Sequence, residues 1–196
     1  MNDIWKTLRT GYEEHGRARR AIAGNADQAI RRAKQAIFAL HRDDAAEATR
    51  LLAETKALFA ACDAPMKKFA DLRTEGPYVA ALEEFAEASL FAGYLKNGKL
   101  GAIDRRAMAP GTYLAGLCDA TGEIVRHAMR QVTLGNHAEV ARAFETVEAV
   151  ITYLLDMDLT GYLRTKFDQA KRNLRSLEQM NYEIAIRKEG KLEIGN

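Results

Sequence analysis

The strongest helical pattern in the chain runs from Thr112 to Thr133 and reads TYLAGLCDATGEIVRHAMRQVT. Its apolar and small residues recur at intervals of three and four, which is the spacing of one face of an α-helix. The positions on this face are Leu114, Leu117, Cys118, Thr121, Ile124, Val125, Ala128 and Val132. The segment therefore predicts a helix that packs against other helices.

Helical patterns also fill the chain on both sides of this segment. We expect helices over residues 3–41, 45–62, 77–95, 137–155 and 160–186, with a short one ending near residue 73. Glycines leave open whether the first is one helix or two. Asp43 or Asp44 can cap the second helix, and Pro65 is expected to end it, because proline disfavours helix in the residue before it. Turns are expected at residues 96–99 and 135–136.

Composition and length narrow the fold and the location further. The chain has 196 residues, of which 47% are hydrophobic, so we expect one all-α domain over residues 1–196, a bundle of about six to seven helices. The net charge of +2 argues against a wholly polybasic protein but leaves room for a local basic patch. Cys62 and Cys118 lack metal-ligand spacing and read as reduced thiols, with a disulfide as the less favoured alternative. Without a signal-peptide pattern or a long apolar span, we expect a cytoplasmic protein.

Three carboxylates stand in otherwise apolar helical runs. Glu87 is the only charge in FAEASLFAGYL, residues 85–95, and Asp119 and Glu123 are the only charges between residues 107 and 125. A helix that is apolar all round is normally buried, so the pattern places these acids, with Glu84 beside Glu87, inside the helical core. Buried carboxylates are costly unless they are paired or bind a metal, and the same runs contain no lysine or arginine.

The spacing of the acids indicates what they could bind. Glu84 and Glu87 are three residues apart, and Asp119 and Glu123 are four apart, so each pair shares one helix face. If the two helices pack together, the four carboxylates could converge on a hard divalent ion such as Mg²⁺ or Mn²⁺. The lack of His and Cys ligands argues against zinc. Two ordinary interpretations stay open: a solvated helix face, or a buried acid neutralised by an arginine from another helix.

Basic residues gather near the N-terminus and on the last helix. The two strips comprise Arg17, Arg19, Arg20, Arg31, Arg32 and Lys34, and Arg164, Lys166, Lys171, Arg172 and Arg175. Such runs are usually solvated helix faces, but in a nucleic-acid-binding protein they neutralise phosphates and make binding salt-dependent. His127 lies four residues after Glu123 and could join a site there, although packing or solvent exposure is the commoner role.

Several of these segments resemble one known family. The acidic LEEFAEA at residues 82–88 resembles the acidic motif of translin-associated factor X, and YLAGLCDATGEIVR at 113–126 is similar to the family pattern YLxGxxDxTGExxR. VTLGN at 132–136 fits as well, and residues 163–187 look like the family's last helix, LRxKxD…YxxxxR. The resemblance to the translin family covers about residues 77–187.

The resemblance implies both an architecture and an activity. Translin proteins are all-helical, assemble as hollow octamers and bind single-stranded RNA or DNA, and translin-associated factor X is their Mg²⁺-dependent endoribonuclease. By resemblance, its metal-binding catalytic acids match Glu84, Glu87, Asp119 and Glu123. Because all of these acids are present, the chain looks like the catalytic branch, and a homo-octamer is implied.

The leading hypothesis is therefore a metal-dependent endoribonuclease acting on single-stranded RNA. Bound Mg²⁺ would polarise the phosphoryl oxygen and activate a water, and Asp119 or Glu123 could orient that water. The expected nucleic-acid contacts are Arg126, Arg164, Lys166, Lys171 and Arg172. One alternative is a non-catalytic binding protein like translin, with its acids paired to arginines. A carboxylate-bridged di-iron protein ranks last, because the Glu-x-x-His spacing of that class is missing.

Overall fold

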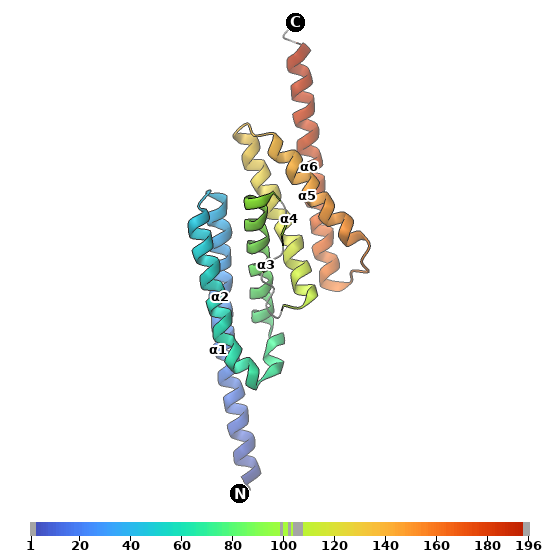
Figure 1. The fold of residues 1–196 in the computed structure, drawn as a ribbon. Coiled ribbons are helices and arrows are strands. Elements are labelled where there is room, and N and C mark those ends of the chain that lie inside the picture. The colour runs from blue at the N-terminus through green and yellow to red at the C-terminus, as the bar shows by residue number, and fades with distance from the viewer. Residues whose placement is uncertain (1–2, 99, 102, 104–107, 194–196) are drawn as a thin grey trace. The chain divides into compact units, whose positions relative to one another are not determined.

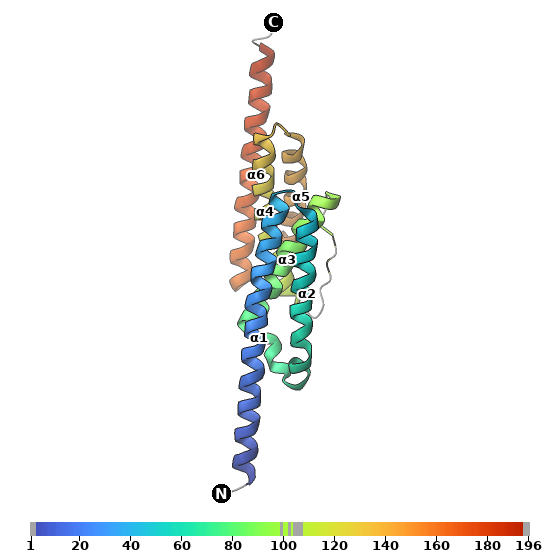
Figure 2. The same ribbon diagram turned by 90° about the vertical axis from the view of Figure 1, so that its left-hand side faces the viewer.

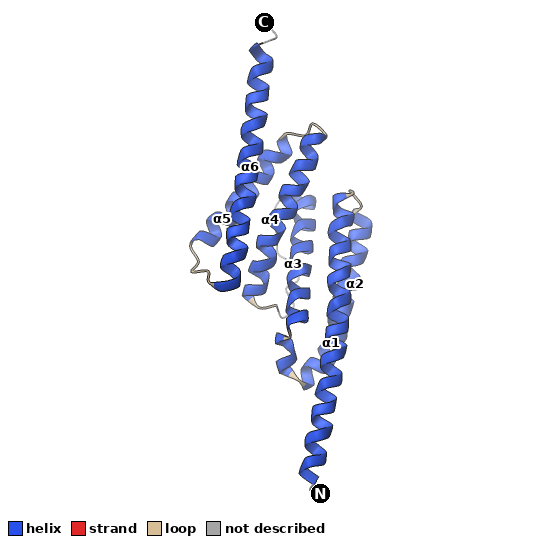
Figure 3. Cartoon of the chain, turned by 180° about the vertical axis from the view of Figure 1, so that it is seen from behind, coloured by secondary structure: helices blue, strands red, loops and turns tan. Residues whose placement is uncertain are grey.

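All regular elements in the described part of the chain are helices, as Figure 3 shows. The computed structural model describes residues 3–98, 100–101, 103 and 108–193. The elements are α1 (Asp3–His41), α2 (Ala45–Lys68), the 3₁₀-helix η1 (Ala70–Thr74), α3 (Gly76–Asn97), α4 (Pro110–Thr133), α5 (Ala138–Leu155) and α6 (Gly161–Glu193). The predicted all-α fold is confirmed.

The helices group into two compact units, Met1–Ala88 and Ser89–Asn196, and the division falls within α3. The first unit contains α1, α2, η1 and the start of α3, and the second contains the end of α3 with α4, α5 and α6. Each unit is described by itself below. A single domain over residues 1–196 stays a prediction.

In the first unit, α1 and α2 form an antiparallel hairpin and lie side by side in both views (Figures 1 and 2). The chain reverses at Asp43, which adopts a φ of 63°, and the side chain of Asp44 accepts a hydrogen bond from the Glu47 amide at 3.0 Å. Asp44 is therefore the cap. Residues 3–41 form one continuous helix, which settles the choice between one helix and two.

Small side chains let the two helices of this hairpin approach closely. The residues of α1 that are buried include Ile22, Ala26, Ala29, Ala33, Ala36, Ile37 and Leu40. The rings of Tyr78 and Phe85 on α3 meet the buried Phe59 of α2 edge-on, with centroids 5.7 and 5.6 Å away. These edge-to-face contacts anchor the start of α3 to the hairpin.

The structure corrects the expected end of the second helix. The helix continues through Pro65 to Lys68 instead of stopping near residue 62. Proline removes only one amide donor here, and it lies in the last turn, where its carbonyl accepts the Phe69 amide at 2.9 Å. Met66 is buried and holds this turn against the unit. Packing therefore outweighs the local preference of proline.

In the second unit, α4, α5 and α6 pack on one another. The face predicted for the helix at 112–133 is largely buried, while Leu114 and Val132 are half-buried. Gly135 ends the segment after α4 with a φ of 80°. The last helix is longer than expected, since it runs to Glu193, and residue 99 of the predicted 96–99 turn lies outside the described residues.

Both cysteines are buried free thiols, as expected, Cys62 in the first unit and Cys118 in the second. Burial raises the pKa of the Cys62 thiol, which keeps it in the neutral form. No helix within the described residues is both long enough and apolar enough to span a lipid bilayer.

Candidate active site

The first pair of predicted acids, Glu84 and Glu87, lies on α3 at the edge of the first unit. Both side chains are half-buried, and that of Glu84 is 19% exposed. The ammonium group of Lys34, on α1, lies 3.6 Å from a carboxylate oxygen of Glu84. The expectation that these acids sit inside the core is therefore wrong, because the core side of α3 is formed by its apolar neighbours Phe85 and Ala86.

The second pair, Asp119 and Glu123, lies on α4 in the second unit and is placed in a similar way. Its side chains are 23% and 21% exposed, so these acids also lie at the margin and not in the interior. Lys166 of α6 reaches Asp119 with an Nζ to Oδ2 distance of 2.5 Å. Arg126, one turn along α4, lies 3.7 Å from Glu123.

Glu84 and Asp119 each have a lysine from another helix close to their carboxylate. The ordinary interpretation anticipated an arginine from another helix, whereas a lysine from another helix approaches each of these two acids. The side chains of the Lys166–Asp119 pair are only 20% and 23% exposed. The Lys34 side chain is 64% exposed, and an exposed ion pair such as Lys34–Glu84 is worth roughly 0–1 kcal/mol. Such a pair can therefore open when a stronger ligand of the carboxylate arrives.

Each unit supplies one pair of acids, and each pair shares a helix face as predicted. Among the described residues of either unit, no three His, Cys, Asp or Glu side chains gather in a way that could hold a metal ion. Two carboxylates nevertheless suit Mg²⁺, which is usually held by one or two carboxylates, several waters and substrate phosphates. The donor chemistry of each pair fits the implied ion, and convergence of the two pairs stays a prediction.

The basic residues expected to contact nucleic acid lie mainly along α6. Arg164 and Lys171 both approach Asp168, at 3.4 and 2.7 Å, and the Lys171 ammonium is the main reason that the pKa of Asp168 is lowered. Arg172 donates to the Gln169 side chain at 2.6 Å. These contacts run along the exposed side of one helix, where phosphate could replace them at little cost. Lys166 differs, because it is half-buried against Asp119.

One buried carboxylate escaped the sequence analysis. Glu139, in the first turn of α5, has a side chain only 7% exposed. It accepts a hydrogen bond from the Tyr94 hydroxyl at 2.6 Å, and Arg142 lies 2.6 Å from its second oxygen. His127 Nε2 lies 3.5 Å away, and its ring packs edge-on against Tyr94.

This Glu139 cluster has clear electrostatic consequences. Burial, followed by the hydrogen bond to Glu139, raises the pKa of Tyr94. The Glu139 carboxylate also raises the pKa of Arg142, so the phenol stays neutral and the guanidinium charged. His127 is buried and takes part in this cluster. In the sequence, only the i,i+3 spacing of Glu139 and Arg142 indicated that these two side chains could pair. The same spacing is common on exposed helices.

A family model described as the Translin family matches residues 19–188, and the chain belongs to this family. No curated protein sequence gives a match. The family resemblance predicted from the motifs is confirmed, and its finer assignment to the catalytic branch stays a prediction.

Solved structures of similar fold cover almost the whole chain. The crystal structure of apo-NeC3PO superposes with a TM-score of 0.83 at 21% identity, covering 93% of this chain and 97% of that one. The crystal structure of AfC3PO gives a TM-score of 0.82 at 19% identity, with the same coverage. A complex of AfC3PO with duplex RNA gives 0.79 at 18% identity, again over 93% and 97% of the two chains. These similarities establish the translin-like fold.

Proposed function

We propose that this chain is a metal-dependent endoribonuclease that binds and cleaves single-stranded RNA. The observation that carries the proposal is the placement of Glu84 and Asp119 at the margins of their units, each beside a lysine. The resemblance to the family implies that these acids, with Glu87 and Glu123, are its catalytic acids. Membership of the translin family supports the proposal. RNA as the ligand is further supported by the similar AfC3PO fold, which has been solved with duplex RNA.

In the proposed reaction, Glu84, Glu87, Asp119 and Glu123 hold Mg²⁺, with Mn²⁺ as a substitute. Bound there, the ion supplies Lewis-acid polarisation of the phosphate and a more acidic water. Asp119 or Glu123 orients the attacking water and accepts its proton as the water oxygen bonds to phosphorus. The P–O bond to the leaving nucleotide breaks, and its oxygen takes up a proton from solvent. Arg126 lies beside Glu123 and contacts the scissile phosphate. Lys166 leaves Asp119 and contacts the phosphate as well.

The remaining basic residues of the proposal bind the rest of the strand. Arg164, Lys171 and Arg172 lie on α6 and face solvent fully or in part. Their contacts with phosphates are not specific for a base, so they hold the RNA without selecting its sequence. Single-stranded DNA would bind to the same strip.

A second candidate is a binding protein without catalysis, and one observation favours it. Glu84, Asp119 and Glu123 each have a cation within 4 Å. In this alternative the ion pairs are permanent and stabilise the helices. RNA then binds to the basic strip and stays intact.

Cleavage in the presence and absence of metal separates these two functions. Labelled single-stranded RNA is incubated with the pure protein in Mg²⁺ or in chelator, beside Glu87→Gln and Asp119→Asn. We expect Mg²⁺-dependent cleavage by the wild type and a loss beyond the roughly 10- to 100-fold typical of removing an outer-shell partner. Glu145→Gln, on the exposed side of α5, is the control and should cleave normally.

The outcomes of this assay discriminate clearly. RNA that is bound but remains intact with Mg²⁺ present would favour the non-catalytic alternative.

Elemental analysis for iron tests the di-iron alternative. The proposed homo-octamer is tested by light scattering after gel filtration, where we expect eight times the 21.8 kDa of one chain.

A further inference from the structure

A basic groove with an exposed aromatic ring runs between α1 and α2 in the first unit. Its volume is about 590 Å³. The lining includes four cationic side chains, Arg32, Lys34, Arg42 and Arg50, together with Phe38 and Glu47. This combination of cations and an aromatic ring is the one that proteins use to bind single-stranded nucleic acid.

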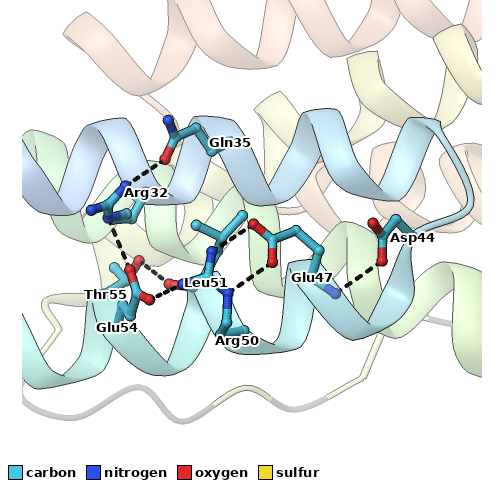
Figure 4. Close-up of polar contacts among 8 residues, drawn as sticks. All are labelled: Arg32, Gln35, Asp44, Glu47, Arg50, Leu51, Glu54 and Thr55. Carbon is cyan, nitrogen blue, oxygen red and sulfur yellow. Dashed lines mark hydrogen bonds and ion pairs between the residues drawn. The ribbon is translucent and has the colours of Figure 1, made fainter.

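Part of the positive charge in the groove is held by exposed carboxylates. Figure 4 shows Arg50 between Glu47 and Glu54 on α2, and Arg32 reaching across to Glu54 from α1. Arg50 contacts Glu47 through two nitrogens, at 2.8 and 2.6 Å, and Arg32 lies 2.9 Å from Glu54. These residues are at least one-third exposed, and exposed pairs of this kind hold each other weakly. A phosphate could therefore displace the carboxylates or use the remaining guanidinium donors.

Phe38 points away from the core, although it lies in the part of α1 whose other apolar side chains are buried. Its neighbours Ile37, Ala39 and Leu40 are buried, whereas Phe38 is 53% exposed. The guanidinium carbon of Arg42 lies 4.8 Å from the centre of the Phe38 ring. A single exposed aromatic is ordinary by itself, but this ring lies in a groove of cations and beside a guanidinium, and both flat groups stack on nucleobases.

One residue that lines the groove also contacts Glu84, a predicted catalytic acid. Lys34 precedes Phe38 by one helical turn, so the two side chains share a face of α1. Lys34 lines the groove, and its ammonium lies 3.6 Å from Glu84. A strand that contacts Phe38 and Lys34 would therefore place a phosphate next to Glu84.

We infer that the groove between α1 and α2 is a binding track for single-stranded nucleic acid, in which Phe38 stacks on a base and Arg42 and Lys34 contact its flanking phosphates. This inference deepens the proposed function and rests on it for the identity of the ligand. It gives Phe38 a role in binding and not in the chemical step. It also gives Arg32 and Lys34, two members of the N-terminal basic strip, a place in the contact surface.

The test measures binding in chelator, so that no cleavage occurs. Fluorescence anisotropy follows labelled oligouridylate binding to the wild type, Phe38→Leu and Phe38→Tyr. We expect Phe38→Leu to weaken binding about tenfold, as typical for the loss of one stacking ring, and Phe38→Tyr to restore it. Tyr153→Leu, which removes a similarly exposed ring from α5, is the matched control and should bind as the wild type does.

A second strand isolates the stacking contribution. An oligomer of the same length with abasic positions carries the same phosphates but offers no base to Phe38. The wild type and Phe38→Leu should bind this strand equally. Arg42→Gln should weaken binding to both strands and reduce the slope of log affinity against log salt by about 0.7, the change for one phosphate contact.

Each result bears on a different statement. If the wild type binds oligouridylate and Phe38→Leu binds equally well, the track is wrong while the proposed function stands. An equal loss on both strands, or a change in the mass of Phe38→Leu in solution, would also overturn it, because Phe38 would then act in folding or assembly. If the wild type binds no RNA at all, the proposed function itself fails and the track fails with it.

Discussion

Glu139 shows how much a single side chain can contribute to the second unit. It accepts a hydrogen bond from the Tyr94 hydroxyl and pairs with Nη2 of Arg142, both at 2.6 Å. Removing it leaves a buried hydroxyl and a partly buried charge without their acceptor, and such unsatisfied groups are costly. The cluster is therefore a stabilising element of the packing around α5.

The loss of stability on substitution of Glu139 should depend on which hydrogen-bonding groups are left without a partner. Glu139→Ala should lower the free energy of unfolding by about 2–3 kcal/mol. Glu139→Gln keeps an acceptor for Tyr94 and should lower the free energy of unfolding by less. Tyr94→Phe should lower it by about 1 kcal/mol. Urea denaturation followed by circular dichroism measures all three, and equal losses in Glu139→Ala and Tyr94→Phe would show that the ion pair contributes nothing.

A second residue-scale prediction concerns acid pH. The hydrogen bond from His15 at 2.7 Å is the main reason that the pKa of Asp71 lies below its ordinary value. A carboxylate with a lowered pKa stabilises the folded state above its ordinary pKa, and this stabilisation is lost as the pH falls through the lowered value. Asp71→Ala should therefore reduce the urea midpoint at pH 7.

The same difference should shrink once the pH falls below the ordinary carboxyl pKa of about 4 and on through the lowered pKa of Asp71. Midpoints measured from pH 7 to pH 3 test this course. Asp158→Ala removes another exposed carboxylate, outside the helices, and serves as the control. A pH-independent difference between Asp71→Ala and the wild type would contradict the assignment to His15.

At the scale of elements, the hairpin of α1 and α2 depends on a tight reversal at residues 42–44. The Asp44 side chain satisfies the Glu47 amide, one of the donors that a helix start leaves open. Asp44→Ala should destabilise the protein by about 1 kcal/mol, and Asp44→Ser should recover most of that. Thermal or urea unfolding measures the difference, and an unchanged midpoint in Asp44→Ala would show that water replaces the cap.

The elements also show where local patterns predict well. The regular three-and-four spacing of α4 predicted its buried face, because a helix with one apolar stripe has only one favourable way to pack. The helix end predicted at Pro65 was wrong because packing by distant residues decides it. The local preference of proline is small compared with the burial of Met66 and the hydrogen bond at Phe69, which depend on the rest of the unit.

At the scale of the whole molecule, the basic strip on α6 makes a prediction about salt. If Lys171 and Arg172 contact phosphates, the double substitution to glutamine should weaken RNA binding and reduce the slope of log affinity against log salt by about 1.4, twice the single-contact value. Binding in chelator over a range of salt concentrations measures the slope. An unchanged slope would remove these residues from the interface.

The candidate site divides in the same way between local and long-range information. Glu84, Glu87, Asp119 and Glu123 could be selected because each stands in an apolar run, and their motifs resemble one family. Their partners could not be predicted, since Lys34 and Lys166 lie about fifty residues away from the acids that they contact. The groove beside Phe38 was equally hidden, because a phenylalanine in a helical pattern is usually in the core.

The sequence by itself determined the class of fold, the family and the positions of the acid pairs, because helix periodicity and short motifs are local properties of the chain. Only the tertiary structure decided that these acids lie at the margins, that Glu139 is buried, and that Phe38 faces a basic groove. Burial and ion pairing depend on which distant residues pack together, and the spacing of residues within one helix does not contain that information.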